Sequence, residues 1–154
     1  MIGWENAWNK IIRNVIFKDS ELKQLMKIPS NTGILQFIDK YFIRAGYTSE
    51  LLSNEACRIV YSDTLAGDTQ VPAVKKNIIT FDIYVKNEDL HNVGQDRLVF
   101  RTSLITERLF YLLTKDRYVA DTGYRFWPAG EWDFGTRTIG YSRHTVSFYY
   151  MRVY

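Results

Sequence analysis

A strict alternation of apolar and polar residues over residues 77–87 constrains the fold of this chain more than any other feature. The alternating residues are, in order, Ile79, Thr80, Phe81, Asp82, Ile83, Tyr84, Val85 and Lys86. Because successive side chains of a strand point to opposite faces of a sheet, this pattern predicts a strand with one apolar face and one face open to water. The apolar face must be covered, so the rest of the chain has to supply a layer that packs on it.

Helical spacing occurs in the first third of the chain. Over residues 4–17 the apolar residues recur on one stripe: Trp4, Trp8, Ile11, Ile12 and Val15. A short second helix is expected after Asp19 or Ser20, either of which can cap it, and Pro29 closes it. Residues 34–45 again have helical period, and Gly46 is a plausible stop.

A longer helical pattern covers residues 95–115. Its apolar stripe consists of Leu98, Ile105, Leu109 and Leu112. Asp96 lies near the expected start, where a negative charge suits the helix dipole. We expect Trp8 and Leu109 to be buried where these helices face the sheet.

The remaining segments have the character of strands. Residues 57–63 predict one strand, residues 123–134 another around the turn 128–130, and residues 137–153 a long last strand. The chain is therefore predicted to be a single α+β domain over residues 1–154, mainly helical in 1–55 and β-β-α-β-β in 57–154. We expect an antiparallel (mixed) sheet of about four strands, with the long helix on one face and the N-terminal helices beside it.

Length, charge and cysteine content exclude several classes of protein. The 154 residues suit one domain, and the 20 basic residues are interleaved with 17 acidic ones, unlike the clustered charge of a nucleic-acid domain. Cys57 is the single cysteine, so no intrachain disulfide is possible. With no signal-like start and no apolar stretch near the ~18 residues that span a membrane, we expect a cytosolic product without a membrane partner.

The sequence offers no recognisable catalytic constellation. His91 and His144 have no cysteine or second histidine at metal-ligand spacing, and a lone histidine in a strand is most simply a residue of the polar face. Residues 133–135 spell Asp-Phe-Gly, but the other kinase elements are missing. We therefore expect no enzyme activity, no catalytic residue, no metal and no cofactor, although a small enzyme whose site forms between subunits stays open.

Aromatic residues make up 16% of the chain and gather around the turn at 128–130. We expect Phe126, Trp127, Trp132 and Phe134 to flank a projecting hairpin and to form part of a subunit interface, since apolar patches on turns mark contact sites. The alternative is that two of them fold back onto the sheet as core.

A second interpretation concerns the last strand. Tyr141, Arg143, Tyr149 and Met151 could form an aromatic and basic platform for nucleic acid, with Tyr150, Arg152 and Tyr154 on the opposite side. Cross-strand packing of the aromatics explains the same pattern, and it is favoured because acidic residues dilute the positive charge elsewhere.

The order of elements resembles that of the tail terminator and tail-to-head joining proteins of long-tailed phages. The resemblance lies in the strand 78–87, the helix around 102–109, the β region that begins at 123–126 and the strand 141–150, and it covers roughly residues 1–17 and 57–154. It implies a structural virion protein of the tail or neck, assembled in the host cytoplasm.

The resemblance also implies the partners. Members form a homo-oligomeric ring, commonly a hexamer, which caps the tail tube and meets a neck or head-completion protein, with DNA passing through the lumen without sequence-specific binding. A ring subunit buries two sides against its neighbours, which suits the high aromatic content. A different minor capsid or neck-adaptor role is the alternative within the same class.

Overall fold

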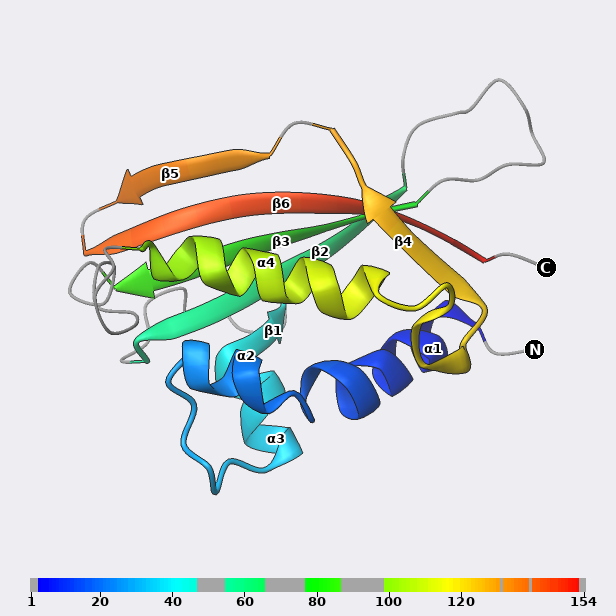
Figure 1. Cartoon of the computed structure of the whole chain (residues 1–154), viewed down its shortest axis with the longest axis horizontal. Coiled ribbons are helices and arrows are strands. Elements are labelled where there is room, and N and C mark those ends of the chain that lie inside the picture. Colours follow the sequence, from blue (N-terminus) through cyan, green and yellow to red (C-terminus); the bar gives the residue numbers. More distant parts are fainter. Residues whose placement is uncertain are drawn as a thin grey trace.

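The computed structural model describes residues 3–46, 55–65, 77–86, 99–130, 132–138 and 140–152, with the side chains of 64, 65 and 134–138 excepted (Figure 1). The helices are α1 (Trp4–Ile11, prolonged by a π-helical turn Ile12–Ile16), α2 (Ser20–Leu25), α3 (Ile34–Gln36, prolonged by a π-helical turn Phe37–Tyr41) and α4 (Arg101–Thr114), and a 3-10 turn covers Val119–Asp121. The strands are β1 (Phe42–Arg44), β2 (Cys57–Leu65), β3 (Asn77–Lys86), β4 (Tyr124–Pro128), β5 (Asp133–Thr138) and β6 (Tyr141–Arg152).

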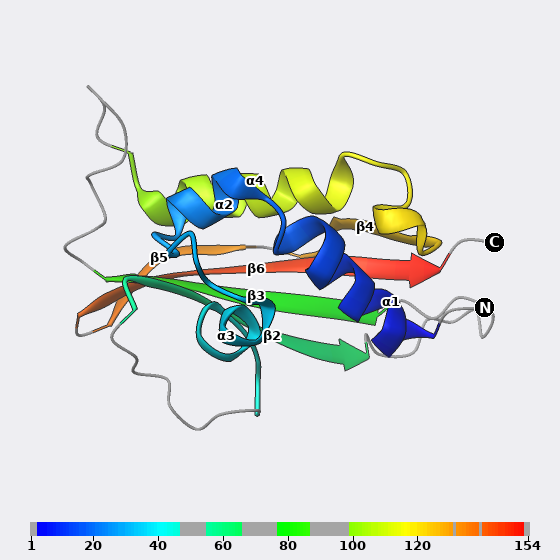
Figure 2. The same cartoon turned by 90° about the horizontal axis from the view of Figure 1, so that it is seen from below.

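The strands form one mixed sheet. Its order is β1-β2-β3-β6-β4, and β5 also pairs with β6. β1 is parallel to β2, whereas the other pairs are antiparallel. Helices α1, α2 and α4 lie together on one side of the sheet, and α3 lies beside β1 at its edge (Figures 1 and 2). This arrangement confirms the predicted α+β class, with six strands in place of about four.

The alternation that constrained the fold is realised in β3. Its residues 79, 81, 83 and 85 are buried under the helices, and those between them are half-buried on the opposite face. β6 continues the pattern, because Val146 lies opposite Phe81 and Phe148 opposite Ile79 in the antiparallel register. The two central strands thus present one continuous apolar surface.

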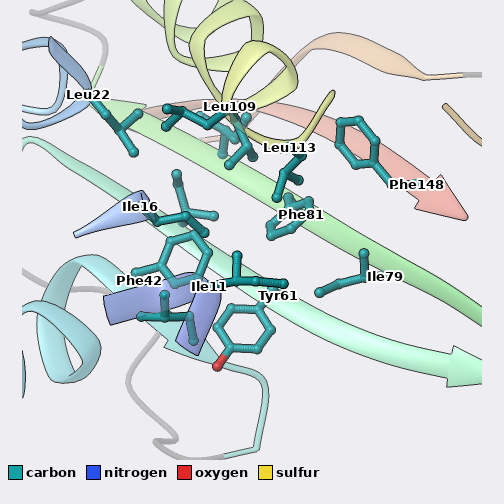
Figure 3. Packing of buried hydrophobic residues seen from close by; sticks show 14 of the residues in the cluster. Ile11, Ile16, Leu22, Phe42, Tyr61, Ile79, Phe81, Leu109, Leu113 and Phe148 are labelled. Atoms are coloured by element: carbon teal, nitrogen blue, oxygen red, sulfur yellow. The ribbon is translucent and has the colours of Figure 1, made fainter. Parts of the chain in front are cut away.

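The helices cover this surface with the predicted stripes. Trp8 and Leu109 are 1% and 0% exposed, as expected from their helical spacing. Trp8 lies against the rings of Tyr61 and Phe81, at centroid distances of 5.4 and 6.1 Å. Figure 3 shows Leu109 and Leu113 of α4 above Phe81. The core therefore forms between one face of the sheet and the helices that cover it, and it also includes Phe37 from the turn after α3 and Val119 from the 3-10 turn.

Several element boundaries differ from the predictions. The last strand, expected over residues 137–153, begins at Tyr141, because residues 133–138 form β5. The helix expected over 34–45 ends at Tyr41, and Phe42–Arg44 form β1 instead. Phe42 is fully buried against Phe37 and Tyr61, so pairing with β2 satisfies the backbone while the ring stays in the core. The long helix begins at Arg101, and the two described residues before it are not helical. The expected start at residue 95, with Asp96 and Leu98, lies outside the described residues.

Side chains of α4 hold both ends of α2 through hydrogen bonds. The Asp19 side chain caps α2 by accepting a hydrogen bond from the Leu22 amide at 2.8 Å, as predicted, and it also accepts one from Arg108 Nε at 2.8 Å. At the other end the buried Arg101 guanidinium donates to the Leu25 carbonyl at 2.6 Å, where a positive charge suits the end of a helix. Two arginines on α4 thus hold α2 antiparallel to it.

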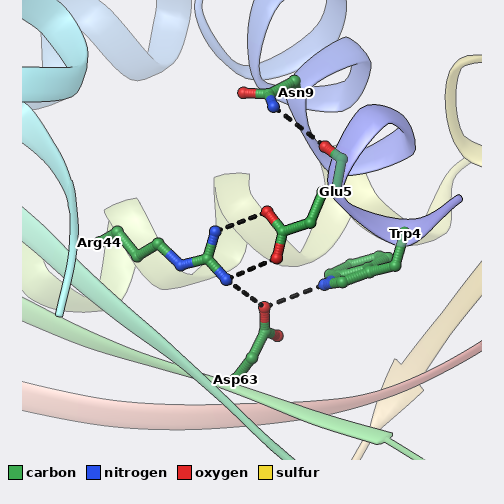
Figure 4. Close-up of polar contacts among 5 residues, drawn as sticks. All are labelled: Trp4, Glu5, Asn9, Arg44 and Asp63. Carbon is green, nitrogen blue, oxygen red and sulfur yellow. Dashed lines mark hydrogen bonds and ion pairs between the residues drawn. The ribbon is translucent and has the colours of Figure 1, made fainter.

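A polar clasp fixes the start of α1 to the sheet (Figure 4). Arg44 donates two hydrogen bonds to the Glu5 carboxylate, at 2.6 and 2.8 Å, and the Trp4 indole N–H donates to Asp63 at 3.0 Å. Burial raises the pKa of Asp63, against the Trp4 hydrogen bond and the charge of Arg44, which lies 3.8 Å away. The Trp4 ring also stacks on Tyr150 at 3.8 Å, so this residue joins α1 to both β2 and β6.

The cap of α2 gives a pH-dependent prediction. Partial burial acts to raise the pKa of Asp19, but hydrogen bonds from Arg108 and the Leu22 amide hold it below its ordinary value. The stability from this charge is therefore complete above the unfolded pKa of about 3.9 and is lost as the pH falls through the lower folded pKa. Asp19→Asn, which retains a capping side chain, should lower the free energy of unfolding by about 1–2 kcal/mol at pH 7.

Urea unfolding at neutral pH and near pH 3 measures this effect. The difference between the natural chain and Asp19→Asn should shrink at the acid end. Glu21→Gln is the matched control, because Glu21 pairs with the same Arg108 at 2.9 Å from a side chain that is 61% exposed, and it should cost less. A difference that persists undiminished at pH 3 would contradict the role of the Asp19 charge.

Candidate interaction surfaces

The four aromatics predicted to share an interface are not brought together. Phe126 is buried in the core, within 6.2 Å of both Trp4 and Trp8. Trp127 lies on the opposite face of the sheet and packs on Tyr149. Trp132 is half-buried on the helix side, and the side chain of Phe134 lies outside the described residues. The alternative was that two of the four fold back onto the sheet as core: Phe126 is core, and Trp132 packs against the core while remaining half-buried.

Over the described residues of this region, β4 and β5 do not pair with each other as the predicted hairpin. β4 and β5 each pair antiparallel with β6 and follow one another along the same edge, because Tyr124 lies opposite Arg152 and Thr138 opposite Tyr141. Between them Gly130, at φ +63°, allows the chain to leave the strand and return. The turn chemistry at 128–130 therefore interrupts one edge strand rather than reversing the chain.

At this interruption the Trp132 side chain makes a hydrogen bond to the backbone of β6, in a place where a strand backbone would otherwise donate it. The Ala129 amide donates to the Ser147 carbonyl at 2.9 Å, and the Trp132 indole N–H donates to the same oxygen at 3.0 Å. The indole ring meanwhile packs on Phe148, at 5.6 Å, and edge-on to Phe110 of α4, at 6.2 Å. The residue is held in place by the sheet and presents its remaining surface beside α4.

A groove runs between Trp132 and α4. It has a volume of about 370 Å³, and its walls are mainly apolar. The lining residues are Ser103, Thr106, Glu107, Phe110 and Trp132. Phe110 is 37% exposed here although it belongs to a helix that covers the core. We call this the Trp132 groove.

A second groove of about 360 Å³ lies on the other side of α4, towards α2. Its lining residues are Glu21, Leu25, Leu104, Glu107, Arg108 and Tyr111. Tyr111 is 48% exposed, and Glu107 lines both grooves. The outward side of α4, consisting of Leu104, Glu107, Phe110 and Tyr111, thus forms a ridge between two hollows, which we call the α4 ridge.

The sequence analysis did not identify the α4 ridge as a surface. It recognised the leucine stripe that includes Leu109 and Leu112 but not the two aromatics between them. Phe110 and Tyr111 fall off that stripe, and two large aromatics on the outward side of an amphipathic helix are a detectable signal.

The sheet face opposite to α1, α2 and α4 is a second surface. Its described residues, which we call the outer face, come from five strands: Ile43, Arg58, Val60, Ser62, Ile78, Thr80, Asp82, Tyr84, Lys86, Arg125, Trp127, Tyr141, Arg143, Thr145, Ser147, Tyr149 and Met151. Most are half-buried, whereas Ile43 and Arg58 are buried and Arg125 is exposed.

The predicted nucleic-acid platform is placed on this face in part. Tyr141, Arg143, Tyr149 and Met151 share the outer face. Tyr150 lies on the opposite face, in the core, as the alternation requires, and Tyr154 falls outside the described residues. Trp127 adds an aromatic ring that the platform had not included.

The two histidines and the cysteine differ in their placement and burial. His91 lies outside the described residues. His144 is not on the polar face as expected but buried beneath α4, where its Nε2 lies 3.0 Å from the Thr102 hydroxyl, and burial lowers its pKa against the influence of Asp133. Cys57 is buried at the start of β2. Over the described residues, no group of histidine, cysteine or acidic side chains could hold a metal ion.

Comparison with known proteins gives no match: no family model, no curated protein and no solved structure is similar to this chain. In the part of the chain that the structure describes, no helix has both the length and the apolar character needed to cross a membrane.

Proposed function

We propose that this chain is a structural virion protein, a ring-forming tail terminator or head–tail joining subunit that caps the tail tube and connects it to the neck. The observation that carries the proposal is the presence of two unlike surfaces on opposite sides of one sheet. The α4 ridge with its two grooves lies on the helix side, and the outer face lies on the other.

A closed ring requires this kind of subunit. In a cyclic assembly each copy contacts two neighbours through two different patches, and the ring closes when the rotation between copies closes. Aromatic residues are enriched at such contacts. Both surfaces here carry them, with Phe110 and Tyr111 on the α4 ridge and Trp127 and Tyr149 on the outer face.

The polar groups of the described chain support a structural role. Asp19, Arg101 and Arg108 fasten α2 to α4, and Glu5 and Arg44 fasten α1 to β1. These charges hold α2 against α4 and α1 against the edge of the sheet. The outer face also carries Asp82 in its middle, where the carboxylate accepts a hydrogen bond from Thr145 at 2.6 Å, which weakens the case for a phosphate-binding platform.

Light scattering coupled to size exclusion, followed by negative-stain imaging, tests the proposal. The purified chain of 18.2 kDa should form ring-shaped particles, with a mass on the order of 110 kDa if six copies assemble. A monomer at every protein concentration would contradict a ring subunit. Binding of single-stranded DNA with a steep salt dependence by such a monomer would favour the nucleic-acid interpretation instead.

A further inference from the structure

The α4 ridge carries an acidic group at its centre. Glu107 is exposed, lines both grooves, and makes no hydrogen bond or ion pair with any residue the structure describes. The neighbouring Arg108 is already engaged, because its guanidinium bonds the carboxylates of Asp19 and Glu21. The ridge therefore offers a negative charge flanked by the aromatic rings of Phe110 and Tyr111.

The outer face has the complementary character. Its accessible basic side chains are Lys86, Arg125 and Arg143, because Arg58 is buried, and its acidic side chains are Asp82 and Asp133, which both lie opposite Thr145. Arg143 occupies a central strand, opposite Tyr84 on β3, in the same half of the face as Tyr141 and Lys86. Around Arg143 the outer face thus carries a second basic side chain, Lys86, and the rings of Tyr84 and Tyr141, whereas the α4 ridge is acidic and aromatic.

We propose that the α4 ridge of one copy docks on the outer face of the next copy, with Glu107 facing Arg143. The inference rests on the proposed ring function and names the surfaces that would form its repeated contact. The two surfaces lie on opposite sides of the same sheet (Figure 2). Contact between the ridge of one copy and the outer face of another is therefore heterologous, and each pair of copies still has one free ridge and one free outer face. The next copy adds to the free patches until the ring closes.

Charge and apolar area have different roles in this contact. The rings of Phe110, Tyr111 and Trp132 provide surface that is removed from water, and the groove beside Trp132 can receive a side chain of the outer face. The opposed charges of Glu107 and Arg143 fix the register and disfavour wrong pairings. A contact between two identical α4 ridges would instead bring two Glu107 carboxylates together.

Reversal of these charges gives a direct test. Glu107→Arg and Arg143→Glu should each weaken assembly more than tenfold in the concentration needed for half assembly, because like charges then meet at every contact. An equimolar mixture of the two variants should assemble again, with the copies alternating, since every contact once more joins an acid to a base. The double variant should also assemble alone.

Matched controls are available away from both surfaces. Asp39→Arg and Arg13→Glu make the same changes of charge at exposed positions on the helices and should assemble like the natural chain. Arg125→Glu reverses an exposed charge at the other end of the outer face, opposite Met151, and should also assemble like the natural chain if the contact is centred on Arg143. Thermal unfolding of each variant establishes that the chain is folded before its assembly is compared.

The outcomes separate this inference from the proposed function. If the natural chain never forms a ring, the proposed function fails and the docking contact fails with it. If the natural chain forms rings and the reversed variants assemble equally well, or their mixture does not recover, the ring stands and the contact between these two surfaces is wrong.

Discussion

Replacing Trp8 with alanine is expected to lower the free energy of unfolding by about 3–5 kcal/mol. Trp8 is 1% exposed and lies where α1 meets the sheet, with the rings of Tyr61, Phe81 and Phe126 around it. Its removal leaves a cavity that aromatic neighbours on different strands cannot readily fill. Since folded domains are stable by only about 5–15 kcal/mol, this single change should shift the urea midpoint strongly.

The control for this prediction is Leu35→Ala. Leu35 is 71% exposed on α3, so its removal should change the free energy of unfolding by less than about 0.5 kcal/mol. Equilibrium urea unfolding, followed by far-UV circular dichroism, measures both variants. Equal effects for the two substitutions would show that α1 does not pack on the sheet through Trp8.

Those parts of the fold that depend on local periodicity could be predicted from the sequence. The alternation in β3, the stripe of α1 that includes Trp8 and the stripe of α4 that includes Leu109 show which side of each element is buried, and that information is local. The same reasoning could have placed His144 correctly. His144 alternates along β6 in step with Val146 and Phe148, so its side chain points to the same buried face as theirs. The prediction placed it on the polar face because the imidazole is polar.

Features that depend on pairing between distant segments could not be predicted in this way. Phe42 fits a helical stripe with Ile38, yet the parallel partner in β2 draws residues 42–44 into the sheet. The Pro-Ala-Gly turn at 128–130 is compatible with a hairpin and with an interrupted edge strand. Only the pairing of β4 and β5 with the same strand, β6, distinguishes these two cases.

The residues that line the Trp132 groove could be predicted only in part, for the same reason. Trp132 does line a groove at the surface, but Phe126 and Trp127 point to opposite faces because they are neighbours in a strand. Four aromatics that are close in sequence were treated as one patch. The surface near Trp132 is completed instead by Phe110, which comes from α4 and is distant in the chain.

Trp132→Ala is expected to abolish or strongly weaken assembly while a folded, cooperatively melting chain remains. Part of the indole packs on Phe148 and bonds the Ser147 carbonyl, so some loss of stability is expected, on the order of 1–2 kcal/mol. The rest of the ring forms a wall of the Trp132 groove. An aromatic at the centre of an interface contributes about 2 kcal/mol or more per contact, and a ring repeats each contact at every subunit.

Phe110→Ala separates the effect on assembly from the effect on stability. Phe110 is 37% exposed, so its replacement removes the opposite wall of the groove but leaves the hydrogen bond from Trp132 to Ser147 in place. Size exclusion with light scattering should show both variants shifted towards monomer, whereas Leu35→Ala, an exposed apolar residue away from the groove, should assemble normally. The effects on assembly should also exceed what the melting temperatures of the variants explain. If Trp132→Ala lowers only stability and its folded fraction assembles like the natural chain, Trp132 belongs to the core alone and the ring contact lies outside this groove.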